Sequence, residues 1–151
     1  MLTVCWSLKG GSGTTLVAAV LAARSPRRHL PVLVVDLAGD IAPTLGLADP
    51  TGSGVHDWVA TSSTPPEAIQ AIAVTATDDL RLAHPGTARA PLQHPRWDVL
   101  GDYLADLDTH VIVDAGLHPP PALIEVADQN LLVVRPCYLT LRRASPMPFR
   151  P

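Results

Sequence analysis

The fold of this chain is decided by the stretch Ser7–Thr15, whose sequence is SLKGGSGTT. It contains three glycines and Lys9, which is the only lysine among the 11 lysine and arginine residues of the chain. An apolar run, Leu2–Trp6, precedes the stretch, and an apolar, alanine-rich run, Thr14–Ala23, follows it. A glycine-rich turn between a strand and a helix aims backbone N–H groups at an anion, and the helix dipole adds to the attraction. The stretch therefore predicts a phosphate-binding loop.

Segments typical of strands and helices alternate along the rest of the chain. We expect further strands at 31–35, 80–83, 110–113 and about 130–135, and helices at 41–48, 55–60, 66–74, 95–107 and 121–127. This alternation predicts an α/β fold, a parallel β-sheet flanked by helices. The length of 151 residues suits one domain over residues 1–151, with an irregular tail at 145–151.

Two acids follow buried strands of the predicted sheet, Asp36 after the second strand and Asp114 after the fourth. Ligands of parallel sheets bind beyond the carboxyl ends of the strands, where the glycine-rich turn also lies. Thr15 occupies the position of the magnesium-binding hydroxyl in the motif GxxxxGK[ST]. An aspartate at the end of a strand is also a common cap or turn residue. Together with the loop, however, Thr15, Asp36 and Asp114 predict a magnesium site.

The loop departs from the motif GxxxxGK[ST] at two positions. When it is aligned on Gly13 and Thr15, Thr14 replaces the lysine and Leu8 replaces the first glycine. Loss of a charge-assisted contact of about 1.5–3 kcal/mol lowers nucleotide affinity roughly 10- to 100-fold. Catalysis suffers more, because phosphoryl transfer depends on electrostatic positioning. We therefore expect weak to moderate binding of ATP or ADP with Mg²⁺, and slow or absent hydrolysis.

The segment KGGSGTT, followed by an apolar helix, resembles the deviant Walker A motif, KGGxGK[ST][TS], of the ParA/MinD family of P-loop ATPases. The resemblance implies a MinD-like (SIMIBI) P-loop NTPase core. It also implies that Lys9 is the signature lysine, which reaches the nucleotide of the partner subunit in a dimer and takes part in catalysis. The residues expected to bind ATP or ADP are Lys9, Gly10, Gly11, Ser12, Gly13, Thr14 and Thr15.

Further segments resemble the same family. VLVVDLAGDIAPTLGL resembles its second motif, in which Asp36 is the first, catalytic acid and Ala38 stands where a second acid positions the attacking water. The segment from Gly39 to Leu45 is similar to the TadZ/CpaE branch. Residues 110–114 resemble the Walker B strand, and 80–86 the third strand. The strands and base-recognition segment that follow in full members have no counterpart here, so we expect a naturally short form or a fragment of a longer reading frame.

The resemblance implies a nucleotide-dependent homodimer that positions cellular cargo or machinery, in cell division, chromosome partition or pilus assembly, with a protein partner that the sequence does not identify. Two alternatives stay open. The chain is a degenerate pseudo-ATPase scaffold that no longer binds nucleotide, or, less in keeping with its residues, an enzyme similar to dethiobiotin synthetase.

Composition argues against several other classes. The net charge of −3 gives no global attraction to nucleic acid or to anionic membrane. The only basic pairs are Arg27-Arg28 and Arg142-Arg143, and the histidines and cysteines show no zinc-binding spacing. No apolar stretch approaches the roughly 20 residues of a membrane span. Cys5 and Cys137 are far apart without a secretion signal, so we expect reduced thiols and a cytoplasmic protein.

Overall fold

The computed structural model describes residues 1–24 and 31–147, so that the pair Arg27-Arg28 and the end of the predicted tail, 148–151, lie outside the described residues. The elements are β1 (Leu2–Ser7), α1 (Thr14–Ala23), β2 (Val32–Asp36), α2 (Ile41–Thr44), α3 (Val55–Ala60), α4 (Ala68–Ile72), β3 (Val74–Thr77), β4 (Leu80–Ala83), α5 (Arg96–Asp106), β5 (His110–Leu117), α6 (Pro121–Val126), β6 (Gln129–Leu132) and α7 (Tyr138–Ala144).

A six-stranded sheet in the order β3-β4-β2-β5-β1-β6 forms the central layer of the described chain. Every neighbouring pair is parallel except β3 with β4. The strands β1, β2 and β5 are buried and almost continuously apolar, as expected where helices cover both faces of a parallel sheet. The predicted α/β architecture is therefore confirmed.

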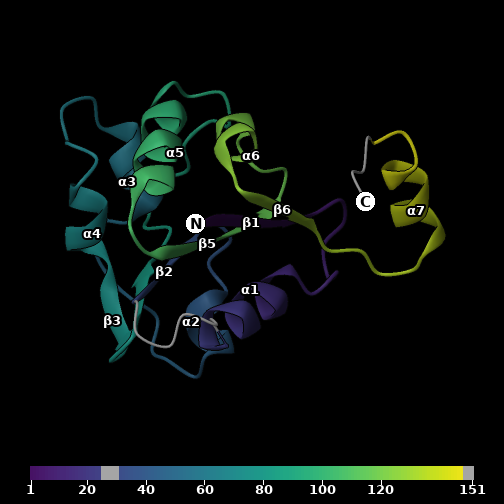
Figure 1. Ribbon diagram of the computed structural model, residues 1–151, viewed down its shortest axis with the longest axis horizontal. Helices are drawn as coiled ribbons and strands as arrows, with labels where there is room; N and C mark the ends of the chain where they lie inside the picture. Colours follow the sequence, from purple (N-terminus) through teal and green to yellow (C-terminus); the bar gives the residue numbers. More distant parts are fainter. Residues whose placement is uncertain (25–30, 148–151) are drawn as a thin grey trace.

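Helices pack on both faces of the sheet (Figure 1). On one face α1 and α2 bury small and branched side chains, including Ala18, Ala22 and Ile41, against β2 and β5. On the other face α3, α5 and α6 bury a larger cluster that includes Trp97 and Leu123. The alanines of α1 permit a close approach to the sheet, which brings the first turn of this helix up to the ends of β1 and β5.

The structure differs from the sequence-based prediction at the edge strand β3. The helix expected to reach residue 74 ends at Ile72, and Val74–Thr77 forms β3. Its Thr75 and Thr77 are β-branched, which favours extended backbone, and the short connection at residues 78–79 lets β3 pair antiparallel with β4. The predicted end of this helix is therefore two residues too late, and the strand β3 was not predicted.

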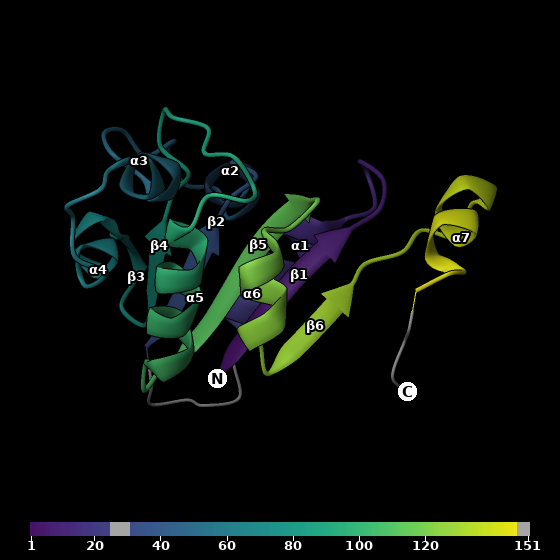
Figure 2. The same ribbon diagram turned by 90° about the horizontal axis from the view of Figure 1, so that it is seen from above.

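Three further differences concern the second half of the chain. The strand β5 continues to Leu117, so Asp114 lies within it and not at its end. The last strand, β6, ends at Leu132, two to three residues before the predicted end. Residues 138–144, for which we made no helix prediction, form α7, which lies to one side of the sheet beyond β6 (Figure 2).

No helix within residues 1–24 and 31–147 combines the length and the apolar character needed to cross a membrane.

Candidate functional site

The loop between β1 and α1 is held by hydroxyl groups that bond to its own carbonyls. Ser7 Oγ donates to the carbonyls of Lys9 and Gly116 at 3.2 and 3.3 Å, and Ser12 Oγ donates to that of Lys9 at 2.7 Å. Gly13 has a φ of 93°, a left-handed conformation that glycine adopts without strain. The first N–H groups of α1 have no partner within the helix, which makes this end an anion-binding position.

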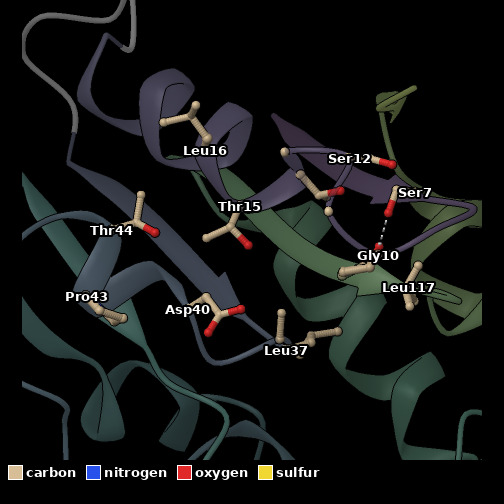
Figure 3. A pocket seen from close by; sticks show the side chains of 16 residues that line it. Ser7, Gly10, Ser12, Thr15, Leu16, Leu37, Asp40, Pro43, Thr44 and Leu117 are labelled. Atoms are coloured by element: carbon tan, nitrogen blue, oxygen red, sulfur yellow. Dashed lines mark hydrogen bonds between the residues drawn. The ribbon is translucent and has the colours of Figure 1, made fainter. Parts of the chain in front are cut away.

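A cavity of about 840 Å³, the nucleotide-size cavity, lies over this loop at the carboxyl ends of β1, β2 and β5. Figure 3 shows Thr15, Asp40, Thr44 and Leu37 around the same space. Its remaining walls come from Ser7, Gly10, Gly11, Ser12, Gly13, Thr14, Leu16, Ala38, Pro43, Ala115, Gly116 and Leu117. The carboxyl ends of three parallel strands thus meet at one cavity, which is where ligands of parallel sheets bind.

Asp114 lies in β5 behind the loop and is fully buried. Its Oδ1 accepts the N–H of Gly116 at 3.1 Å, whereas Oδ2 is buried without a hydrogen-bond partner among the described residues. Burial raises the pKa of this carboxyl, and the hydroxyl of Thr15 and the Gly116 N–H oppose the rise. A buried carboxyl that lies close to Thr15 and keeps one oxygen without a partner suits a cation or a water molecule held by one.

Asp36 has a different role in the geometry. Its Oδ1 accepts the N–H groups of Ala38 and Gly39 at 2.9 and 2.6 Å, and its Oδ2 accepts that of Ile41 at 3.0 Å. Burial raises the pKa of Asp36, and these three hydrogen bonds oppose the rise. The carboxylate closes the turn from β2 into α2 and is not among the residues that line the nucleotide-size cavity. That turn carries the exposed Asp40 to the wall of the cavity.

The structure brings together most of the residues predicted to bind nucleotide. All six from Gly10 to Thr15 line the nucleotide-size cavity, and Thr15 also lies close to Asp114. Thr14 lines the cavity although it is only 6 % exposed. Lys9 is exposed and lines a smaller, adjacent cavity.

Sequence reasoning did not assign Asp40 or Thr44 to the site. Both lie on the wall that α2 forms, because the carboxylate of Asp36 turns the chain back toward the loop. The sequence indicates only that Asp40 follows closely after the end of β2. This spacing does not place Asp40 at the cavity unless the conformation of the turn is known.

No protein-family model matches the sequence, and no curated protein matches it. Solved structures do match. A ParA family ATPase from Chlorobium tepidum TLS has a TM-score of 0.68 at 24 % identity, over 95 % of this chain and 64 % of that one. The septum site-determining protein MinD from Pyrococcus horikoshii OT3, solved with Mg-ADP, has a TM-score of 0.69 at 18 % identity, over 94 % of this chain and 61 % of that one.

This chain has the ParA/MinD P-loop NTPase fold. It spans less than two thirds of the length of either neighbour. Within the ParA/MinD fold, the loop from Ser7 to Thr15 and the nucleotide-size cavity lie at the carboxyl ends of the central strands. The sequence-based assignment to a MinD-like P-loop core is therefore confirmed at the level of the fold.

Proposed function

We propose that this chain is a ParA/MinD-like protein that binds ATP or ADP with Mg²⁺ in the nucleotide-size cavity. The observation that carries the proposal is that the glycine-rich loop and Thr15 line one cavity of about 840 Å³. The fully buried Asp114, whose Oδ2 has no hydrogen-bond partner among the described residues, lies beside Thr15 behind this wall. That volume is within the range of cofactor sites, roughly 300–1,000 Å³. The MinD structure that shares this fold was solved with Mg-ADP.

The residues of the loop fit a phosphate–magnesium group. The N–H groups at the start of α1 would hold the phosphates, the hydroxyl of Thr15 would bind Mg²⁺, and Asp114 would hold its water shell. The described residues contain no cluster of three or more histidine, cysteine or acidic side chains placed to hold a metal. Mg²⁺ would therefore take most of its ligands from phosphate and water, as it commonly does. When bound, it neutralises phosphate charge.

Asp36 belongs to the proposed site as the residue that shapes it. Its three accepted N–H bonds fix the turn that presents Ala38 and Asp40. The catalytic and metal-binding role predicted for Asp36 from the family resemblance stays a prediction. It would act through water, because Asp36 is not among the residues that line the nucleotide-size cavity.

We further propose a homodimer with slow or absent hydrolysis. Lys9 is exposed and lies outside the walls of the nucleotide-size cavity, so its ammonium is accessible to a second copy. Thr14 places no cation over the phosphates, and Ala38 supplies no acid to orient water. From the family resemblance we also propose a role in positioning cellular machinery, in the manner of the TadZ/CpaE branch. From the two distant cysteines we propose a cytoplasmic location.

Calorimetric titration with Mg-ADP and Mg-ATP tests nucleotide binding. We expect binding to wild-type protein, with affinity lowered at least about 10-fold in Thr15→Ala, which removes the metal-binding hydroxyl. The matched control is Thr51→Ala, an exposed threonine in the loop before α3. Binding that is equal in both variants would contradict the proposed site.

A second candidate function is a scaffold that keeps the fold without nucleotide. Thr14 in place of the loop lysine is the observation that favours it. The scaffold predicts no heat of binding with either nucleotide, in wild type or in Lys9→Ala. The dimer proposal instead predicts ATP-dependent association in sedimentation experiments, lost in Lys9→Ala while ADP affinity is kept.

A further inference from the structure

A second cavity, of about 290 Å³, lies beside the phosphate loop, and we call it the flanking cavity. Its walls are formed by Lys9, Gly10 and Ser12 of the loop and by Arg135, Pro136, Cys137 and Thr140 of the segment that follows β6. Gly10 and Ser12 also line the nucleotide-size cavity, so the loop is a wall common to both.

Two arginines attach the segment after β6 to the back of the loop. Arg143 Nη1 donates to the carbonyl of Leu8 at 2.7 Å, and Arg135 Nη1 donates to that of Gly11 at 3.4 Å. A single long bond leaves the other N–H donors of the Arg135 guanidinium available to a ligand. The segment therefore adds a cation to the loop at the position where the flanking cavity opens.

The charge of the flanking cavity is uncompensated by the described residues. Their interactions include no ion pair between a carboxylate and either Lys9 or Arg135. The chain as a whole has a net charge of −3. Two cations at one small cavity are therefore a local excess of positive charge on a negatively charged chain. Cations without a protein partner at a cavity wall attract an anionic ligand.

Polar groups complete the wall. Thr140 is fully buried, and its hydroxyl lies 3.1 Å from Cys137 Sγ. Hydrogen bonds from Thr140, and the positive charge of Lys9, lower the pKa of the Cys137 thiol. The field within the cavity therefore favours negative charge. Ser12, whose hydroxyl donates to the Lys9 carbonyl, is a further polar residue of the wall.

We propose that the flanking cavity binds an oxyanion of the phosphate class between Lys9 and Arg135. A guanidinium matches the geometry of phosphate oxygens, and an ammonium adds a point charge. A volume of about 290 Å³ suits phosphate or pyrophosphate better than a whole nucleotide. This site is separate from the one proposed for the nucleotide, although the two share the loop.

The oxyanion has two possible sources. One is free phosphate or pyrophosphate. The other is the terminal phosphate of a nucleotide bound by a second copy of the chain, and this source alone rests on the proposed function. In both cases Arg135 supplies a positive charge near the loop, whereas Thr14, at the position of the usual loop lysine, supplies none.

Free oxyanions are tested first, by calorimetry with inorganic phosphate and with pyrophosphate in the absence of nucleotide. We expect Arg135→Gln to weaken binding about 10- to 100-fold, as loss of a charge-assisted contact does. The matched control Arg142→Gln removes an exposed arginine of α7 and should leave the affinity unchanged.

Cys137 provides a second readout within the cavity. Iodoacetamide should alkylate Cys137, whereas Cys5 is fully buried and burial raises its pKa to about 12. Phosphate should slow the alkylation of Cys137 in wild type and in Arg142→Gln, and have no effect in Arg135→Gln.

The second source is tested by sedimentation with Mg-ATP and with Mg-ADP. If the anion comes from the nucleotide of a second copy, Arg135→Gln weakens the Mg-ATP-dependent dimer and leaves Mg-ADP affinity unchanged. If the protein binds no nucleotide but binds phosphate in an Arg135-dependent manner, the proposed function fails and this proposal stands. If Arg135→Gln changes neither phosphate binding nor the Mg-ATP response, the proposal is wrong.

Discussion

Asp36 and Asp114 are direct neighbours across β2 and β5, paired Cα to Cα in the parallel register, yet their carboxylates are used in opposite ways. The two carboxylate oxygens of Asp36 accept hydrogen bonds from three backbone N–H groups. Asp114 leaves Oδ2 buried without a hydrogen-bond partner among the described residues. Asp36 thus holds the turn from β2 into α2. Asp114 retains an oxygen without a partner behind the glycine-rich loop.

Replacing Asp114 by asparagine should separate binding from stability. Asp114→Asn removes a buried, uncompensated charge, so the unfolding temperature of the nucleotide-free protein should rise. The same change should weaken Mg-ADP binding about 10- to 100-fold, the usual effect of losing a group that orients a bound metal. Thermal melts and calorimetry measure the two effects. Asp102→Asn, an exposed residue of α5, is the control and should change neither.

The nucleotide-free protein should lose stability as pH rises above about 4, the ordinary carboxyl value. Burial raises the folded-state pKa of both Asp36 and Asp114, so between the unfolded and folded values the folded chain holds more protons. The free energy of unfolding then decreases with increasing pH across that interval. His56 acts in the opposite direction, because burial lowers its pKa.

Comparison with Asp114→Asn isolates the contribution of Asp114 to this pH dependence. Urea unfolding at several pH values from about 4 to 8 should show wild type losing stability relative to the variant as pH rises. A difference that stays constant over the whole range would show that Asp114 does not titrate abnormally.

Gly13 should resist substitution through backbone strain alone. Its φ is 93°, and a Cβ built there meets no atom within 4 Å, so Gly13→Ala adds strain without a clash. We expect a loss of about 1–2 kcal/mol in the free energy of unfolding, the cost of a left-handed conformation for a residue with a Cβ. Gly10→Ala is the matched control, since Gly10 has equal space and no positive φ. Equal losses in the two variants would contradict the assigned loop conformation.

Restoring the loop lysine should strengthen nucleotide binding. Thr14 lines the nucleotide-size cavity, so Thr14→Lys places an ammonium beside the proposed phosphates. We expect Mg-ATP affinity to increase about 10- to 100-fold, the reverse of the loss attributed to the native threonine. Val20→Lys adds the same charge to an exposed position further along α1 and should have little effect. A failure of Thr14→Lys to bind more tightly than Val20→Lys would favour the scaffold alternative.

The first part of the fold could be predicted from the sequence because its signals are local. The helix expected at 14–23 is α1 as observed, and the first strand is only one residue longer than predicted. Glycines, an apolar run and an alanine-rich run specify strand, turn and helix without reference to distant residues. Residues 10–15, which the same signals predict to bind phosphate, line the nucleotide-size cavity, and their binding role stays a prediction.

Elements that depend on distant partners were predicted less well. The strand β3 forms because it pairs with the edge of β4. The strand β5 extends past Asp114 because it pairs with β1 as far as Leu117. The helix α7 and the flanking cavity depend on Arg135 and Arg143 reaching the carbonyls of the loop, more than 120 residues away in the chain. Periodicity and turn residues carry no information about such pairings.

The sequence by itself determined that a glycine-rich loop joins a strand to a helix, that Thr14 stands at the position of the usual lysine, and that the only lysine of the chain, Lys9, precedes the glycines. Only the tertiary structure decided the separate roles of Asp36 and Asp114, and only it brought Arg135 beside Lys9. The physical reason is that a loop conformation depends on the backbone preferences of its own residues. The hydrogen bonds and charge around a carboxylate depend on which strands and side chains the fold packs against it.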